Sequence, residues 1–262
     1  MRILGIVNIT DDSFSDGGKF LSSRSAIDHA VHLSRGGADI VDLGAASSNP
    51  EASRVPPAVE IERLAPVIRA LRKGSVEVSV DSFSTEVQRF ALSEGVHMLN
   101  DIHGFADPDL YKELGKSSAM LVVMHSVQKE GVATKANTPA QEIVGRILNF
   151  FDERVETLLR FVSRDRLILD PGLGFFLGTD PACSFAAIRA IPEIKSRYGL
   201  PVLISASRKS FLGAVTGRAV LERSAATLAC ELEARRLGAD YIRTHDPAAL
   251  LDGCKIQDQI YS

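Results

Sequence analysis

The sequence predicts an α/β fold, a single (β/α)8 TIM barrel that spans residues 1–262. Eight short apolar runs rich in Val, Ile or Leu each end in a polar or ionisable cluster. A segment with helical spacing follows these clusters, and several such segments stop at a glycine. The chain has 262 residues, which matches the roughly 250 residues that one such barrel usually needs.

The expected strands are short and mostly lack polar alternation, which is typical of strands buried on both faces. They cover Ile3–Asn8, Ile40–Leu43, Val76–Val80, Met98–Leu99, Ala119–Met124, Leu167–Leu169, Pro201–Ile204 and Tyr241–Ile242. The polar clusters are Asn8-Ile9-Thr10, Asp42, Asp81-Ser82, Asn100-Asp101, His125-Ser126, Asp170-Pro171, Ser207-Arg208-Lys209 and Arg243-Thr244-His245. In a parallel barrel all of them lie at one rim, where barrel enzymes place their chemistry.

Helical spacing fills the intervals between the expected strands. The clearest helical segments are Ser25–Arg35, Ile61–Leu71, Thr85–Leu92 and Ala225–Leu237. An open doubly wound sheet would also alternate strands and helices, but it usually carries a glycine fingerprint after its first strand. Here that position reads Thr-Asp-Asp-Ser-Phe-Ser-Asp-Gly-Gly, so the barrel is favoured. The longest segments without a pattern are 10–22, 45–58 and 127–140, which we expect to form lids and binding walls.

Composition excludes several classes of partner. The formal net charge of -3 argues against bulk nucleic-acid binding, and no apolar run is long enough to span a membrane. The first ten residues lack the pattern of a secretory signal. Three widely spaced cysteines, Cys183, Cys230 and Cys254, favour a reducing compartment over a disulfide framework. We therefore expect a cytoplasmic protein with neither nucleic-acid nor membrane partners.

The ends of the seventh and eighth strands predict an anion site. Ser207-Arg208-Lys209-Ser210 and Arg243-Thr244-His245 supply cations and hydroxyls at the corner where barrel enzymes often bind phosphate. Arg243 and His245 are two residues apart on an extended segment, so their side chains share a face. The alternative is that these are solvated surface charges.

A second set of strand ends, Asp42, Asp81, Asn100 and Asp170, is acidic or carries an amide. Such groups are costly to bury without hydrogen-bond donors, and a heterocycle with several N–H groups would satisfy them. For Asp42 and Asp101 the alternative of a helix cap stays open. A zinc site is not favoured, because Asn8-Ile9-Thr10 stands where a metal-dependent hydrolase would have His-x-His.

These motifs, in this order, resemble the dihydropteroate synthases over nearly the whole chain. The resemblance rests on Ile6–Gly18, Asp42-Leu43-Gly44, Ser79–Ser82, Leu99–Ile102, Leu169–Gly172, Ser207–Ser210 and Arg243–His245. It implies condensation of 6-hydroxymethyl-7,8-dihydropterin pyrophosphate with para-aminobenzoate, giving 7,8-dihydropteroate and pyrophosphate. It also implies a Mg2+ cofactor and a homodimer.

The resemblance assigns roles to individual residues. It implies that the catalytic residues are Asp81, Lys209, Arg243 and His245, and that Asp81, Asn100, Asp170 and Lys209 bind the pterin. The pyrophosphate would contact Asn8, Arg243 and His245, with magnesium at Asn8 aided by an aspartate of the first loop. Para-aminobenzoate would contact Ser48, Pro50, Phe175, Phe176, Ser207 and Lys209.

Two loops depart from the family pattern. Asn49 stands in the place of the usual arginine, and Gly174-Phe175-Phe176-Leu177-Gly178 lacks the usual lysine and adds a bulky group. Both stretches are similar to the sulfonamide-insensitive branch of the family. Sulfonamides are bulkier than para-aminobenzoate, so Phe175 or Phe176 could exclude the drug and spare the substrate.

Two other functions remain open. Pterin-binding methyltransferases resemble the same barrel, although they need neither the Asp/Ser-rich first loop nor the Ser-Arg-Lys corner. A non-catalytic pterin-binding paralogue is the second alternative. Release of pyrophosphate from the two substrates distinguishes the synthase from both.

Overall fold

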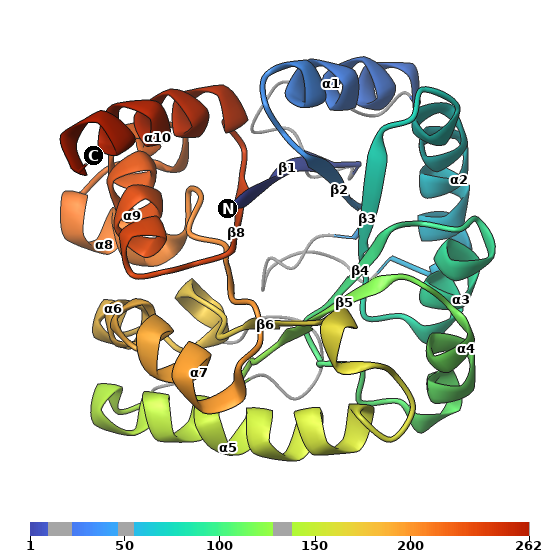
Figure 1. Cartoon of the computed structure of the whole chain (residues 1–262). Helices are drawn as coiled ribbons and strands as arrows, with labels where there is room; N and C mark the ends of the chain where they lie inside the picture. Colours follow the sequence, from blue (N-terminus) through green and yellow to red (C-terminus); the bar gives the residue numbers. More distant parts are fainter. Residues whose placement is uncertain (10–22, 47–54, 128–137, 262) are drawn as a thin grey trace.

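Eight parallel strands form one closed sheet in the computed structural model, which describes residues 1–9, 23–46, 55–127 and 138–261. The hydrogen-bonded order is β6-β5-β4-β3-β2-β1-β8-β7. A parallel bridge between Leu169 and Val202 joins the two ends of this order, and the Leu169 amide donates to the Pro201 carbonyl at 2.9 Å. The predicted barrel is confirmed, and the helices surround it (Figure 1).

The strands and helices alternate along the chain. The strands are β1 Arg2–Asn8, β2 Ile40–Gly44, β3 Glu77–Asp81, β4 Met98–Asp101, β5 Met120–Met124, β6 Leu167–Asp170, β7 Leu203–Ile204 and β8 Tyr241–Thr244. The α-helices are α1 Ser23–Arg35, α2 Pro57–Lys73, α3 Thr85–Ser93, α4 Tyr111–Lys116, α5 Ala140–Leu158, α6 Pro181–Arg189, α7 Ile191–Tyr198, α8 Ser210–Thr216, α9 Ser224–Arg236 and α10 Pro247–Tyr261. Short 3-10 helices include η4 Gly174–Phe176 and η5 Val220–Glu222.

Several strand and helix bounds differ from the expected ones. Asp81 and Asn100 pair with each other inside the ladder, so β3 and β4 extend into their polar ends. The seventh strand is shorter than expected, since Pro201 has no amide hydrogen to donate. Helix α2 begins at Pro57, inside the segment expected to be a loop, because proline is well suited to the first helical turn.

The barrel interior changes from apolar to polar along the strands. Side chains two residues apart on a strand point the same way. The apolar layer inside the barrel consists of Leu4, Ile40, Met98, Val122, Ile168 and Leu203. Two residues further along three of these strands stand Asp42, Asn100 and Asp170, all buried. The same two-residue period that packs the barrel therefore directs polar groups into its mouth.

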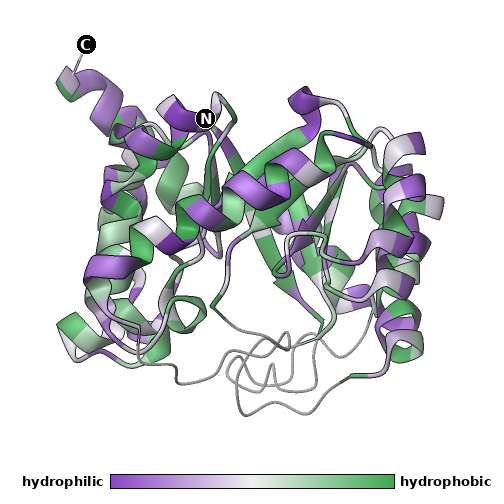
Figure 2. Ribbon diagram, turned by 90° about the horizontal axis from the view of Figure 1, so that it is seen from below, coloured by the Kyte–Doolittle hydropathy of each residue, from purple (hydrophilic) through white to green (hydrophobic). Residues whose placement is uncertain are grey.

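A second, larger core lies between the strands and the helices. Its buried residues come from both, and the strands in Figure 2 are largely hydrophobic, whereas the helices carry hydrophilic residues as well. The free cysteines Cys183, Cys230 and Cys254 lie in α6, α9 and α10. Within the described ranges, no helix combines the length and the apolar character that a membrane span requires.

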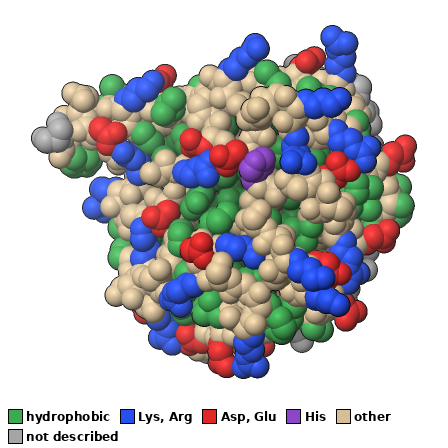
Figure 3. Space-filling view, turned by 45° about the vertical axis from the view of Figure 1, so that its right-hand side comes forward, with side chains coloured by type: hydrophobic (Ala, Val, Ile, Leu, Met, Phe, Trp, Pro, Cys, Tyr) green, Lys and Arg blue, Asp and Glu red, His purple; other side chains and the backbone are tan. Residues whose placement is uncertain are grey.

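The surface carries charges of both signs. In Figure 3, Lys and Arg side chains are interspersed with Asp and Glu. Exposed ion pairs such as Arg146–Glu142 and Arg160–Glu156 join residues one helical turn apart. Each such pair contributes about 0.5 kcal/mol or less, so the surface charges add little to the stability of the fold.

Candidate active site at the barrel mouth

Arg243 joins two carboxylates inside the mouth of the barrel. Its Nε donates to Asp42 Oδ2 at 2.5 Å, and its Nη2 donates to Asp81 Oδ2 at 2.7 Å. Asp42 is completely buried, so it is an ion-pair partner and not a solvent-exposed helix cap. The two carboxylates keep the Arg243 pKa above its ordinary value despite burial. The guanidinium is therefore a permanent charge at this position.

The pKa of Asp81 lies above its ordinary value. Burial is the main cause, and the nearby Asp42 and Asp101 add to it, while Arg243 and Lys209 oppose it. The net result raises the pKa of Asp81 to about 6. The carboxylate is then mostly ionised at pH 7 and accepts hydrogen bonds.

Asn100 and Asp170 complete the polar interior beside Asp81. Asp170 is 2% exposed, and its Oδ1 accepts the Gly172 amide at 2.7 Å. Asn100 is 3% exposed, and its Oδ1 has no partner among the described residues. A buried acceptor in this state is a position where a ligand donor is expected.

Lys209 approaches the same cluster from the start of α8. Its charge lies near Asp170 and Asp81, which favour protonation, whereas burial disfavours it and lowers the pKa to about 8. The Nζ also lies 5.1 Å from the centre of the Phe176 ring, a distance typical of a cation–π contact. Lys209 thus connects the acidic cluster to the η4 turn.

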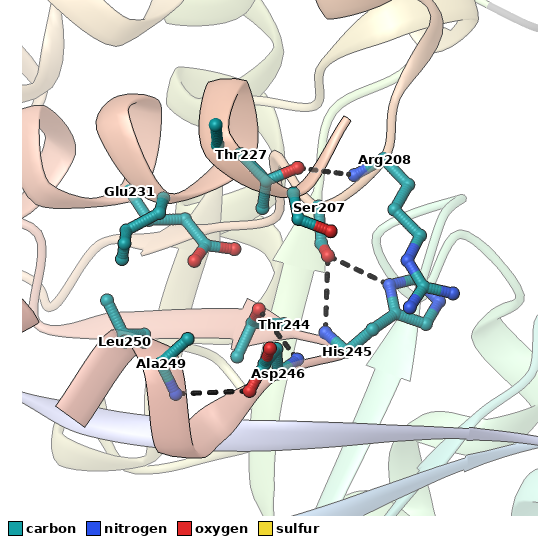
Figure 4. Close-up of a pocket in the computed structure, with 12 residues that line it drawn as sticks. Ser207, Arg208, Thr227, Glu231, Thr244, His245, Asp246, Ala249 and Leu250 are labelled. Atoms are coloured by element: carbon teal, nitrogen blue, oxygen red, sulfur yellow. Dashed lines mark hydrogen bonds between the residues drawn. The ribbon is translucent and has the colours of Figure 1, made fainter. Parts of the chain in front are cut away.

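Ser207 contacts both the backbone and the ring of His245 (Figure 4). The Ser207 hydroxyl oxygen accepts the His245 amide at 3.2 Å and lies 2.8 Å from His245 Nδ1. Burial and the positive charges of Arg208 and Arg243 lower the His245 pKa, so the ring is neutral at pH 7. In the tautomer that accepts the hydroxyl proton at Nδ1, Nε2 carries the ring proton and can donate to a ligand.

Phe175 and Phe176 form part of the η4 turn that follows β6. The Val127 amide donates to the Phe176 carbonyl at 2.9 Å, which links this turn to the segment after β5. Both side chains are partly exposed. The Phe176 ring is the one in contact with Lys209.

Of the remaining predicted site residues, Asn8 is described by the structure and the others lie outside the described residues. Asn8 ends β1, is exposed, and stands opposite Gly44 in the ladder. Ser48 and Pro50 lie outside the described residues, as does the first loop with Asp11, Asp12 and Asp16. Across the described ranges, no group of three or more His, Cys, Asp or Glu side chains is arranged to hold a metal.

Comparisons with known proteins agree on one family. Residues 4–245 match the family described as pterin binding enzyme. The "Dihydropteroate synthase type-3" of Escherichia coli is 51% identical over 256 residues, which cover 97% of each chain. This chain belongs to the dihydropteroate synthase family.

Solved dihydropteroate synthases share the fold. The Xanthomonas albilineans enzyme with 4-aminobenzoic acid has a TM-score of 0.89 and 33% identity, and the match covers 100% of this chain and 93% of that one. The Anaplasma phagocytophilum enzyme with bound 6-hydroxymethylpterin-monophosphate has a TM-score of 0.87 and 34% identity, with 99% and 98% covered. The chain is therefore a dihydropteroate synthase-type transferase in both sequence and fold.

Sequence reasoning gave Asp42 no partner in the site of this synthase, and it did not include the buried groups Ser79 and Glu60. Asp42 pairs with Arg243, Ser79 lies buried two residues before Asp81, and Glu60 accepts a hydrogen bond from Ser82 at 3.1 Å. The two-residue period of the strands is the signal for Asp42 and Ser79, since both share a face with a predicted site residue or with the apolar layer. Glu60 comes from α2, and its contact follows only from helix packing.

Proposed function

We propose that this chain condenses 6-hydroxymethyl-7,8-dihydropterin pyrophosphate with para-aminobenzoate to give 7,8-dihydropteroate and pyrophosphate. The observation that carries this proposal is the buried set Asp81, Asn100 and Asp170 beside the cations Arg243 and Lys209. Acceptors for a flat N–H-rich ring and donors for an anion lie side by side at one barrel mouth. The family match over nearly the whole chain supports the same reaction.

The acidic half of the site would bind the pterin. Asp81 and Asp170 would accept hydrogen bonds from the ring N–H and amino groups, and Asn100 Oδ1 offers a further acceptor. Lys209 would donate to the pterin ring from the opposite side. A complete set of partners would offset the cost of burying these groups.

The cationic corner would bind the pyrophosphate. Arg243 uses its Nε and Nη2 for Asp42 and Asp81, and its Nη1 is the group we assign to the anion. His245 would donate from Nε2. Asn8, exposed at the end of β1, fits a magnesium ion held mainly by substrate oxygens, because Mg2+ usually takes few protein ligands at phosphate sites. When bound, this ion neutralises charge on the leaving pyrophosphate.

The reaction then requires positioning and charge stabilisation. The C–O bond at the pterin methylene breaks, and pyrophosphate leaves with the electron pair toward Arg243 and His245. The neutral arylamine of para-aminobenzoate forms the new C–N bond and afterwards loses a proton. No side chain has to act as a covalent nucleophile.

We further propose that this protein is a resistance-type enzyme whose active site is insensitive to sulfonamides. The support is the Phe176 ring, which is held against Lys209 near the place where para-aminobenzoate would bind. Phe175, Ser48, Pro50 and Ser207 are the other residues we assign to this substrate. An aromatic wall there would collide with drug groups that extend beyond the aminobenzoate ring.

Residues on α8, η5 and α10 support a homodimer. The exposed large hydrophobic side chains there are Val215, Val220, Leu221, Ile256, Ile260 and Tyr261. Helices α8 and α10 both pack on α9, and η5 directly precedes it. Large exposed apolar side chains on neighbouring elements are typical of interfaces. Charged substitutions at Leu221 and Ile260 should shift the sedimentation of the chain from dimer to monomer.

We assign the protein to the cytoplasm, with small molecules as its substrates.

A turnover assay tests the proposed reaction. The purified chain is incubated with both substrates and magnesium, and pyrophosphate and dihydropteroate are measured. Equal amounts of both products are expected. Methyl transfer from methyltetrahydrofolate without pyrophosphate release would support the methyltransferase alternative, and pterin binding without either product would support the non-catalytic paralogue.

A further inference from the structure

Glu60 is a buried carboxyl group that has no role in the proposed reaction. It lies in the first turn of α2 and is 3% exposed. Helix α2 packs on the outside of the barrel against β3, the strand that ends at Asp81 (Figure 1). Burying a carboxyl group is unfavourable unless hydrogen bonds compensate for the lost water, so the partner of Glu60 indicates its role.

The partner of Glu60 is Ser82, the residue directly after Asp81. The Ser82 hydroxyl donates to Glu60 Oε2 at 3.1 Å. The same hydroxyl oxygen accepts the amide of Ser84, the N-cap of α3, at 3.2 Å. Asp81, in contrast, accepts a hydrogen bond from Arg243 inside the barrel mouth. The two neighbouring side chains therefore serve opposite sides of the barrel wall.

Both backbone polar groups of Ser82 are bonded as well. Its amide donates to the Asn100 carbonyl at 3.1 Å, which joins the ends of β3 and β4. Its carbonyl accepts the side-chain amide of Gln88 from α3 at 2.7 Å. Ser82 is 5% exposed and Gln88 is 2% exposed, so water has little access to these contacts. Groups from α2, α3 and β4 thus fix one residue from three directions.

The peptide between Asp81 and Ser82 carries this fixed geometry into the pterin site. Because a peptide unit is planar, a rotation at the Ser82 amide would also tilt the Asp81 carbonyl and move the side chain of that aspartate. The hydrogen bond from Ser82 to the Asn100 backbone would change at the same time. Glu60 thus affects two of the residues that we assign to the pterin.

We propose that Glu60 is a positioning residue for the pterin half of the active site and acts through the Ser82 hydroxyl to fix Asp81 and Asn100. The inference rests on the proposed function, since it concerns the same pterin. Glu60 comes from a helix outside the barrel, so it acts through Ser82 and not by contact with the substrate.

The anion corner has separate support, which makes the inference specific. Arg243 also pairs with Asp42, and His245 contacts Ser207. Neither of these contacts involves Glu60. A change at Glu60 should therefore weaken the binding of a pterin ring and spare the binding of an anion. The two probes are 6-hydroxymethylpterin, which has the ring without the pyrophosphate, and inorganic pyrophosphate with magnesium.

Four single variants test this role. Glu60→Leu and Ser82→Ala each remove the hydrogen bond, whereas Glu60→Gln removes the charge but keeps an acceptor for Ser82. Glu62→Leu is the matched control, because Glu62 lies in the same helix and is exposed. Calorimetry measures the Kd of both probes, and steady-state assays give kcat and the KM of each substrate. The melting temperature reports the stability of each variant.

The loss of one positioning hydrogen bond predicts a three- to tenfold effect. We expect Glu60→Leu and Ser82→Ala to raise the 6-hydroxymethylpterin Kd and the pterin pyrophosphate KM by that factor, with the pyrophosphate Kd unchanged within twofold. The Glu60→Leu, Ser82→Ala double variant should bind the pterin no more weakly than the weaker single variant, since both act through one contact. Glu60→Gln and Glu62→Leu should stay within twofold of the unsubstituted chain.

Three results would overturn the inference. These are wild-type pterin affinity in Glu60→Leu or Ser82→Ala, an equal rise of both Kd values that parallels a fall in melting temperature, or a Glu60→Gln variant as weak as Glu60→Leu. If Glu60→Leu does not fold, Ser82→Ala provides the same comparison.

The same measurements separate this inference from the proposed reaction. An unsubstituted chain that binds 6-hydroxymethylpterin but forms no product would contradict the proposed reaction, and the calorimetric comparison would still decide the role of Glu60. An unsubstituted chain that binds no pterin would refute both.

Discussion

At the scale of single residues, the charges at the barrel mouth compensate one another before any ligand binds. Arg243 lies between Asp42 and Asp81, and Lys209 lies near Asp81 and Asp170. Removing one member of a buried ion pair usually costs about 3–5 kcal/mol, because the other charge stays buried. The residues that we assign to the two halves of the substrate thus also hold each other in place.

Phe176 permits a direct test of drug selectivity. The Lys209 Nζ lies over the Phe176 ring. We expect Phe176→Gly to lower the sulfonamide inhibition constant at least tenfold, because it removes the ring that we propose excludes the drug. The para-aminobenzoate KM should change less than threefold. Inhibition assays on Phe176→Gly and Phe175→Gly measure both quantities, and unchanged drug discrimination in both variants would contradict the hypothesis.

At the scale of elements, the end of β5 fixes the loop that follows β6. The His125 amide donates to the Asp170 carbonyl at 2.8 Å, and His125 Nδ1 lies 3.2 Å from the Pro171 carbonyl. Burial lowers the pKa of His125 to about 4, so the ring is neutral at pH 7 and its Nδ1–H can donate to that carbonyl. These contacts determine where the η4 turn begins.

Gly172 is the tightest point of this arrangement. It has a φ of 73°, and a Cβ there would lie 2.3 Å from the His125 carbonyl oxygen. We expect Gly172→Ala to cost roughly 3 kcal/mol of stability and to raise the para-aminobenzoate KM about tenfold, since the loop must move. Denaturant unfolding and steady-state kinetics measure the two effects.

Gly217 provides the control. It has a similar φ of 68°, but nothing lies within 4 Å of the corresponding Cβ position. Gly217→Ala should therefore cost only about 1 kcal/mol, the price of the left-handed conformation alone. Equal losses in the two variants would show that backbone conformation, and not the contact with His125, explains the effect.

At the scale of the whole molecule, buried acids link stability to pH. Burial raises the pKa of Glu60 to about 7 and that of Glu231 to about 8, whereas both groups have ordinary values near 4.5 in the unfolded chain. Between about pH 6.5 and 8 the folded protein binds more protons than the unfolded chain. Its stability must fall as pH rises through this window.

Below about pH 6.5 the two buried histidines change the stability in the opposite direction from the glutamic acids. The pKa values of His125 and His245 are lowered by burial, so below about pH 6.5 the unfolded chain gains protons at these two sites, which offset the extra protons bound by the folded glutamic acids. We expect the free energy of unfolding to fall by about 2 kcal/mol between pH 6.5 and pH 8 and to depend less on pH below that window. Urea unfolding at fixed protein concentration checks this. The Glu60→Gln, Glu231→Gln double variant should lose the slope, and a wild-type slope in that variant would refute the assignment.

Local patterns were enough to predict the barrel and most of its polar rim. Strand runs and their polar ends are read from neighbouring residues, and the two-residue period directs Asp81, Asn100 and Asp170 inward. The bounds of the strands were less predictable. Asp81 and Asn100 remain in the ladder because each has a strand partner, a fact that depends on the adjacent strand and not on local sequence.

The sequence by itself determined which chemical groups reach the barrel mouth, because strand period and chain direction are local properties. Only the tertiary structure decided their partners. Asp42 and Arg243 are 201 residues apart, and they meet because β2 and β8 both flank β1 in the closed sheet. Glu60 is one polar residue on a helix until packing places it against Ser82. Hydrogen bonds and ion pairs act over a few ångströms, so which groups pair is fixed only once the barrel has closed.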